Sequence, residues 1–482
     1  MTQDSLPTLI IGAGFTGLFA ALHLRHQRYP SEIILIDPQE RFVFKPMLYE
    51  LLTEELPEDV VCPRYTALLQ GSDIVWLQER VEQVDLQQKQ VRLASGNSYS
   101  YQNLVLAVGS VQGYLGTPGA AEHSFAFRSR EEAIGLREHL KACLAQALQT
   151  EDPQEKQALL TVVIVGGGPS GVEMAATLGD LLPSWYAAMG GQIRDLKLVL
   201  FNHAPQILAG DANAHLQKDA LQALKQRTIP IELKLGTGVK SVTGDRLTYQ
   251  TGQEAIASLA THTTIWTAGT ALNPLIEALK VQISPENLAK HGQLVVSPTL
   301  QLPDFPEVLA AGDCVQVQGQ HQPALAQVAY QQGATIAHNL IALSQGKPLQ
   351  ISNARLRGTL MKLGLHNGVA NLFDKVQIPG QAGDLLRNAT YLEMLPTPLH
   401  NFQATAEWLR QETIDRYHHP QPLSSEQLKL LPLSPQERQH YQQVKLLAIL
   451  VPLGLAIATW IGFQTPPNER FPTPNHPTRP AR

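Results

Sequence analysis

Cysteine is scarce in this chain of 482 residues: there are three, Cys62, Cys143 and Cys314, and no two are close in sequence. A dithiol redox pair, which needs two nearby thiols, is therefore excluded, and we expect three buried free thiols in a reducing compartment. Zinc-binding spacings of Cys and His are absent, as is the H-E-x-x-H pattern, so we expect no metal site.

Positive charge is not in excess either. The chain has 37 Lys and Arg against 42 Asp and Glu, a net charge of −5, and no basic patch with interleaved aromatic residues. This balance speaks against a nucleic-acid partner. The N-terminus has no basic region before its first apolar run, so we expect no signal peptide.

Glycine, in contrast, is concentrated in two similar segments, GAGFTG from Gly12 and GGGPSG from Gly166. Each segment follows an apolar strand-like run and precedes an apolar helix-like run. Such a strand, turn and helix bind the pyrophosphate of a dinucleotide at the helix N-terminus, where glycine lets the backbone approach the anion. Two units predict two dinucleotides. The candidate binding residues are Gly12, Gly14, Phe15 and Gly17 in the first unit and Gly166, Gly168 and Gly171 in the second.

The residue that ends the second strand of each unit distinguishes the two nucleotides. In the first unit, EIILID ends at Asp37, 25 residues after Gly12, where a carboxylate can accept hydrogen bonds from an adenosine ribose. In the second unit, LKLVLFN ends at Asn202. A neutral amide does not repel a 2′-phosphate, so Asn202 is either an ordinary turn residue or one that allows both NADH and NADPH.

Further short segments follow in a fixed order. They are LAVGS with Ala107 and Gly109, VEMA after the second turn, WTAGT with Gly269, AAGD with Gly312 and Asp313, and AQVAYQQG at residues 326–333. Together with the two turns, this order resembles the flavin-dependent pyridine-nucleotide oxidoreductases. The last segment resembles the type II NAD(P)H:quinone oxidoreductases in particular. The stretch RFVFKPMLYELL (41–52) is similar to their branch in plastids and photosynthetic bacteria, and the resemblance spans roughly residues 6–417.

The resemblance implies an α/β fold of two nested Rossmann-like domains, with FAD in the first and NADH or NADPH in the second. It also implies that electrons pass from FAD to a membrane quinone. Asp313 would receive a ribityl hydroxyl of FAD, and Glu173, expected at the second position of its helix, would lie beside the nicotinamide. Gln327 and Gln331, four residues apart on one helix face, would line the quinone pocket. Lys45 would stabilise negative charge on the flavin, or is a surface lysine.

The expected organisation alternates between the two domains. We expect helices at 18–28, 128–149 and 323–344 and a polar loop at 151–156. The expected segments are a first part of the FAD domain (1–120), a linker helix (121–159), the NAD(P)H domain (160–275), the second part of the FAD domain (276–345), a C-terminal module (346–430), a hydrophobic segment (440–465) and a disordered tail (466–482).

The hydrophobic segment contains an uncharged run of 18 residues, LLAILVPLGLAIATWIGF, at 446–463. As a helix it would span about 27 Å, close to a hydrocarbon core of about 30 Å. Pro452 permits either a kinked span or an anchor in the membrane plane. We expect this run to attach the protein to a lipid bilayer, with the catalytic domains on the cytoplasmic side. The alternative is a buried terminal helix.

Two other functions stay open on the sequence alone. A flavin reductase could pass electrons to a soluble protein such as a ferredoxin, although that function has no use for a hydrophobic tail. A non-catalytic flavin protein could act as a redox sensor. The type of quinone ring is not readable from the residues, and a homodimer is one assembly to be tested.

Overall fold

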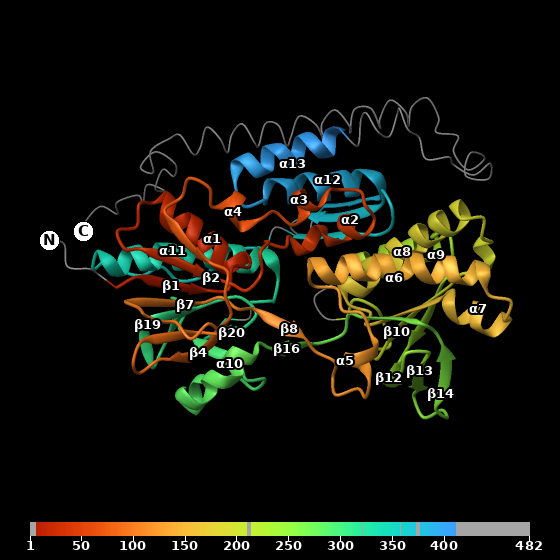
Figure 1. Ribbon diagram of the computed structural model, residues 1–482, viewed down its shortest axis with the longest axis horizontal. Coiled ribbons are helices and arrows are strands. Elements are labelled where there is room, and N and C mark those ends of the chain that lie inside the picture. Colours follow the sequence, from red (N-terminus) through yellow and green to blue (C-terminus); the bar gives the residue numbers. More distant parts are fainter. Residues whose placement is uncertain (1–5, 210–213, 321, 357, 373–375, 411–482) are drawn as a thin grey trace, which may run out of the picture. The chain divides into compact units, whose positions relative to one another are not determined.

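The computed structural model describes residues 6–209, 214–320, 322–356, 358–372 and 376–410 (Figure 1). The chain divides into two compact units, one up to Asp384 and one from Leu385 onward. Both glycine-rich turns lie in the first unit. The second unit is described here from Leu385 to Arg410, and the predicted hydrophobic run at 446–463 lies outside the described residues.

A six-stranded sheet in the order β18-β19-β7-β1-β2-β3 holds the first glycine turn. All neighbouring strands are parallel except β18 and β19, which are antiparallel. Buried Leu, Ile and Val fill its central strands, as expected for a parallel sheet covered on both faces. Its strands are β1 (Thr8–Ile11), β2 (Ile33–Ile36), β3 (Ile74–Leu77), β7 (Asn103–Leu106), β18 (Gln301–Leu302) and β19 (Phe305–Ala310).

A second, four-stranded parallel sheet in the order β11-β10-β9-β15 holds the second glycine turn. Its strands are β9 (Thr161–Val165), β10 (Lys197–Asn202), β11 (Ile231–Leu235) and β15 (Thr263–Trp266). Two stretches that leave the two sheets, β8 (Ser110–Gln112) and β16 (Thr270–Leu272), pair antiparallel directly after Gly109 and Gly269. They form the two chain crossings between the sheets (Figure 1).

The helices differ from the sequence expectation mainly at their starts. α1 runs Phe15–His26, and α11 runs Ala326–Ser344. α8 (Pro169–Ala188) begins with Pro169 at its first turn, where a missing N–H is tolerated, so Glu173 is its fifth residue and not its second. α6 (Arg130–Gln149) begins at a capping box of Ser129 and Glu132.

The expected polar loop at 151–156 is wrong. α7 (Pro153–Leu159) begins there, because the Asp152 side chain caps the backbone N–H of Gln154 and Pro153 starts the helix. The charge of this segment reflects an exposed helix face.

Smaller elements complete the described chain. The remaining helices are α2 (Leu48–Leu52), α3 (Glu58–Val61), α4 (Tyr65–Leu68), α5 (Ala120–His123), α9 (Ala214–Lys225), α10 (Pro274–Leu279), α12 (Gly380–Glu393) and α13 (Pro398–Arg410). The remaining strands are β4 (Val81–Asp85), β5 (Gln90–Leu93), β6 (Ser98–Ser100), β12 (Thr237–Val242), β13 (Arg246–Thr251), β14 (Ala257–Ala260), β17 (Leu294–Val296), β20 (Val315–Val317), β21 (Gly358–Lys362), β22 (Gly368–Leu372) and β23 (Val376–Pro379). Within the described ranges, every helix is too short or too polar to cross a membrane.

Candidate dinucleotide and electron-transfer site

The first glycine turn combines close packing on one side with open space on the other. A Cβ on Gly12, whose φ is 93°, would lie 2.5 Å from the carbonyl oxygen of Ala107, and a Cβ on Gly17 would overlap the carbonyl oxygen of Gly12. A Cβ on Gly14, in contrast, would meet no protein atom within 4 Å. Gly14 is the N-cap of α1 and has no side-chain cap. The free N–H groups of this helix start therefore face space that a pyrophosphate fits.

Asp37 stabilises this turn from the end of β2. Its two carboxylate oxygens accept hydrogen bonds from the backbone N–H groups of Ala13 at 2.7 Å and Gln39 at 2.9 Å. Desolvation raises the pKa of Asp37, and these two hydrogen bonds oppose the shift. Phe15 is buried against Phe42 and Phe44, so its ring supports the turn from the core. These residues fit the adenosine and pyrophosphate half of FAD.

The second glycine turn repeats this geometry. A Cβ on Gly166 (φ 117°) would lie 2.7 Å from Thr267 Oγ1, and a Cβ on Gly171 would overlap the carbonyl oxygen of Gly166. Gly168 is the N-cap of α8, and a Cβ there would again meet no protein atom within 4 Å. The second turn can therefore receive a pyrophosphate in the same way as the first.

Asn202 takes the place that Asp37 has in the first unit. Its Oδ1 accepts the backbone N–H of Gly167 at 3.0 Å, and its Nδ2 donates to the carbonyl oxygens of Ala204 at 3.1 Å and Gln206 at 2.8 Å. The amide is needed because it both accepts and donates, which a carboxylate cannot do. Asn202 thus holds the residues after β10 against the second glycine turn, and its role in the choice between NADH and NADPH stays a prediction.

We predict that Asn202→Asp makes the enzyme prefer NADH over NADPH. The new carboxylate can still accept the Gly167 N–H, but it loses the two hydrogen bonds that the amide donates to Ala204 and Gln206 and adds a charge that repels a 2′-phosphate. The preference for NADH is expected to shift by roughly tenfold, the equivalent of about 1.4 kcal/mol. Ratios of kcat/KM for the two nucleotides measure this shift, with Asn97→Asp as an isosteric control at an exposed residue outside the site. A wild type that already rejects NADPH would contradict this interpretation of Asn202.

Asp313 belongs to a polar group at the end of the first sheet. Ser110 Oγ donates to Asp313 Oδ2 at 2.8 Å, and Arg128 Nη2 donates to Ser110 Oγ at 2.8 Å. The Lys45 side chain is in contact with solvent, but enough protein atoms lie around its ammonium group to desolvate it in part. This desolvation lowers the pKa of Lys45. Arg128 lowers the pKa of Lys45 further, whereas Asp313 and Glu132 oppose the shift. Lys45 and Asp313, which the sequence predicted separately, thus influence each other.

Gln332 is a residue of this region that the sequence did not single out. It is 2% exposed, and its Oε1 accepts the backbone N–H of Gly312 at 2.7 Å while its Nε2 donates to Gln322. Gly312 has a φ of 83°. Gln332 thereby fixes the backbone immediately before Asp313. It follows Gln331 directly in AQVAYQQG but points to the other side of the helix, toward the core.

The two predicted acceptor glutamines both contact one stretch of backbone. Gln331 Nε2 donates to the carbonyl oxygen of Arg355 at 3.0 Å, and Gln331 Oε1 accepts the N–H of Arg355 at 2.9 Å. Gln327 Nε2 donates to the carbonyl oxygen of Gly358 at 3.0 Å. On the α8 side, Glu173 Oε1 accepts the N–H of Lys362 at 2.8 Å. All three predicted side chains therefore hydrogen-bond to backbone groups of Arg355, Gly358 or Lys362.

The three cysteines are buried and unpaired, as the sequence predicted. Burial raises the pKa of Cys62 and Cys314 to about 12 and also raises the pKa of Cys143. None of these thiols is activated as a thiolate at neutral pH, so they offer no route for electrons.

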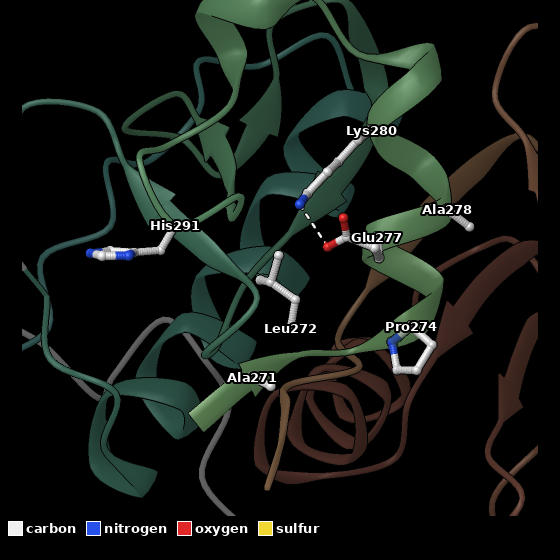
Figure 2. A pocket seen from close by; sticks show the side chains of 7 residues that line it. All are labelled: Ala271, Leu272, Pro274, Glu277, Ala278, Lys280 and His291. Atoms are coloured by element: carbon white, nitrogen blue, oxygen red, sulfur yellow. Dashed lines mark hydrogen bonds and ion pairs between the residues drawn. The ribbon is translucent and has the colours of Figure 1, made fainter. Parts of the chain in front are cut away.

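An open surface pocket lies beside α10, and none of the residues that line it is a predicted site residue. Figure 2 shows its lining: Ala271, Leu272, Pro274, Glu277, Ala278, Lys280 and His291. Its two facing charges, Lys280 and Glu277, are paired with each other at 2.6 Å. The two charges neutralise each other, and we assign the pocket no role in the reaction.

Two sheets whose glycine turns lead to matching open helix starts define a class of protein that binds two dinucleotides. Comparison with known proteins agrees: a family model described as "Pyridine nucleotide-disulphide oxidoreductase" matches residues 7–333. The demethylphylloquinone reductase NdbB of Synechocystis sp. (strain ATCC 27184 / PCC 6803 / Kazusa) is 31% identical over 418 residues, covering 84% of this chain and 96% of the relative. The alternative NAD(P)H-ubiquinone oxidoreductase C1 of Arabidopsis thaliana is 28% identical, covering 84% of this chain and 81% of the relative.

Among solved structures, NDH2 from Plasmodium falciparum in complex with NADH has a TM-score of 0.76 at 18% identity, covering 86% of this chain and 99% of that chain. The chain belongs to the pyridine nucleotide-disulphide oxidoreductases and, among them, to the type II NAD(P)H:quinone oxidoreductases. It is an oxidoreductase that uses FAD and transfers electrons from NADH or NADPH to a quinone.

Proposed function

We propose that the first turn, with Gly14 and Asp37, holds FAD, and that the second turn, with Gly168 and Asn202, holds NADH or NADPH. The observation that carries this assignment is the open space at both helix starts beside glycines that are otherwise tightly packed. When bound, FAD accepts a hydride from NAD(P)H and releases two electrons to a quinone. The protein contributes positioning: each turn fixes one nucleotide, and Ala107, Gly109, Gly269 and Gly312 allow the backbone to pass close to them.

In this proposal, the polar surroundings of the flavin consist of Asp313, Ser110, Arg128 and Lys45. Asp313 accepts from Ser110 and has further acceptor capacity for a ribityl hydroxyl. Lys45 and Arg128 place positive charge where negative charge develops on the cofactor. Glu173 lies beside the nicotinamide and, through the Lys362 N–H, fixes the neighbouring strand β21.

In this proposal the side chains of Gln327 and Gln331 line the quinone-binding site. We expect Gln327→Leu to slow the reoxidation of the flavin by a short-chain quinone roughly twofold to tenfold, because a hydrogen bond to the quinone worth about 0.5–1.5 kcal/mol is lost together with the bond to the Gly358 carbonyl oxygen. Flavin reduction by NADH should be unchanged. Stopped-flow absorbance separates the two half-reactions, and Gln345→Leu, at the exposed end of the same helix, is the matched control. Equal losses in both half-reactions would point to misfolding and contradict the placement of Gln327 at the quinone-binding site.

Membrane attachment through residues 446–463 is the second part of the proposal. The run is apolar enough to bind a bilayer more strongly than a single acyl chain does. We expect full-length protein to need detergent for release, and a chain truncated before Val444 to be released without it while still reducing short-chain quinones. Activity with quinones embedded in vesicles should be lost on truncation. Full-length protein in the detergent-free supernatant would contradict the attachment.

Three further properties can be measured: the ring type of the quinone, the side of the membrane on which the catalytic domains lie, and the oligomeric state. The two relatives are named for demethylphylloquinone, a naphthoquinone, and for ubiquinone, a benzoquinone. We place the catalytic domains on the cytoplasmic side, where NADH and NADPH are present. Comparing kcat/KM for short-chain forms of both rings identifies the acceptor class, and light scattering of the detergent-solubilised protein tests for a homodimer.

A further inference from the structure

A buried group of charges joins the segment beside the flavin to the strand held by Glu173. The ammonium group of Lys362, in β21, is 1% exposed and lies 3.1 Å from Glu50 Oε1 and 2.6 Å from Glu55 Oε2. Glu50, in α2, is 3% exposed at its side chain, and Glu55 is 22% exposed. His366, after β21, lies 3.8 Å from Glu55 and is 44% exposed. The group thus extends from the exposed imidazole of His366 to the buried carboxylate of Glu50.

Stability alone is a weak explanation for this arrangement. Two carboxylates and one ammonium lose their hydration here, and buried ion pairs often contribute no more stability than apolar side chains of similar size. The strand has other anchors: Glu173 accepts the N–H of Lys362, and Asp180 accepts the N–H of Leu365 at 3.1 Å. The buried charges are therefore not needed merely to hold β21.

The overall reaction needs a proton from water, which a group of titratable side chains can deliver. NAD(P)H loses a hydride, which carries two electrons and one proton, whereas a quinone gains two electrons and two protons as two O–H bonds form. The balance is NAD(P)H + H⁺ + quinone → NAD(P)⁺ + quinol. One proton per turnover must therefore come from water.

We propose that His366, Glu55, Lys362 and Glu50 conduct this proton from solvent to the quinone site, an inference that rests on the proposed function. Glu55 receives a proton from water or from His366. Lys362 first gives one of its protons to Glu50 and, as a neutral amine, then takes the proton from Glu55, so that its ammonium charge is restored. Glu50 then gives its proton to a quinone oxygen. The strand that carries Lys362, β21, is also the strand that Gln327 contacts at the Gly358 carbonyl oxygen. Each contact along this route is given above at 2.6 to 3.8 Å.

Glu55 contributes its position between His366 and Lys362, and not basicity. Burial and Glu50 act to raise the pKa of Glu55, but Lys362 and His366 lower it overall, so Glu55 is ionised at neutral pH and holds a proton only briefly before Lys362 takes it. Thr53 Oγ1 also donates to Glu55 at 2.8 Å and fixes its orientation. Among the described residues, the charged groups on the elements packed around Lys362 are Glu50, Glu55, His366, Glu173, Asp180 and Arg227. Arg227 is paired with Asp180 at 2.5 Å, and Glu54 is directed instead to Arg137 and Lys141.

The test uses Glu50→Gln, which keeps an oxygen acceptor for Lys362 but cannot carry a proton. We expect flavin reoxidation by a short-chain quinone to slow on the order of 100-fold, the scale of a lost proton-transfer group, and increasingly so as the pH rises. Flavin reduction by NADH should keep its rate. Reduction of ferricyanide, which takes electrons without protons, should also keep its rate. Imidazole buffer at constant pH should restore quinone reduction, and Glu50→Asp should retain it.

The matched control is Glu54→Gln, which alters an exposed carboxylate outside the group and should leave both half-reactions unchanged. Thermal unfolding of the variants, followed by circular dichroism, provides a readout independent of turnover. A Glu50→Gln protein with a wild-type rate and pH profile of quinone reduction would overturn the proposal. So would equal losses with quinone and ferricyanide without imidazole rescue. A wild type that reduces ferricyanide but no quinone would instead remove the proposed function, and this inference with it.

Discussion

Gly14→Ala is expected to give a folded protein that has lost FAD. The backbone of Gly14 (φ −70°, ψ −161°) is accessible to alanine, and the added methyl group meets no protein atom within 4 Å. It fills instead the space assigned to the pyrophosphate, so we expect FAD to bind on the order of 100-fold more weakly, the equivalent of about 2.8 kcal/mol. Visible absorbance of the purified protein and FAD titration measure this loss.

The fold should survive the change, because replacing glycine by alanine at an N-cap costs only about 1 kcal/mol. Thermal unfolding of the FAD-free wild type and variant should therefore nearly coincide. Gly17→Ala is the contrasting variant: its methyl group overlaps the Gly12 carbonyl oxygen, so it should destabilise the apoprotein as well. A Gly14→Ala protein that retains FAD with wild-type affinity would show that this turn does not receive the pyrophosphate.

Gly168→Ala is expected to give the opposite phenotype, a yellow protein that NADH no longer reduces at normal concentrations. Gly168 has the same N-cap position and the same open surroundings as Gly14, but at the start of α8. We expect the apparent Kd for NADH, from the concentration dependence of flavin bleaching, to rise on the order of 100-fold. FAD content should be unchanged.

The two alanine variants are controls for each other, since each adds the same methyl group at the same type of helix start. Chemical reduction of the Gly168→Ala protein by dithionite should still bleach the flavin and should be followed by normal reoxidation with quinone. If both variants lose FAD, or if both lose NADH binding alone, the assignment of one nucleotide to each turn is wrong.

The glycine turns were predictable from the sequence because the constraint that selects glycine is local. Gly17 and Gly171 lie against carbonyl oxygens only five residues earlier in the chain, so spacing alone reveals the contact. Asp37 was predictable for a similar reason, as the end of a strand that directly follows the first helix. Asn202 was identified by position, but its three hydrogen bonds to the backbone were not foreseen.

Contacts between distant segments were not predictable. Lys362 stands in a strand-like stretch, and nothing near it in sequence shows that Glu50, 312 residues away, lies against its ammonium group. The backbone partners of Gln327 and Gln331 were missed for the same reason, since the partners are carbonyl and N–H groups that any residue could supply. The error at α7 was different: the polar residues were interpreted as a loop although Asp152 and Pro153 form a helix start.

The most direct test of the central claim is sequential anaerobic mixing of the purified holoenzyme, first with NADH and then with a short-chain quinone, while the visible absorbance of the flavin is recorded. This account predicts bleaching by NADH and rapid return of the absorbance on addition of quinone, with one quinol formed per NADH oxidised. Bleaching without rapid reoxidation by quinone, but with reoxidation by a ferredoxin, would contradict it, as would a flavin that NADH and NADPH do not bleach.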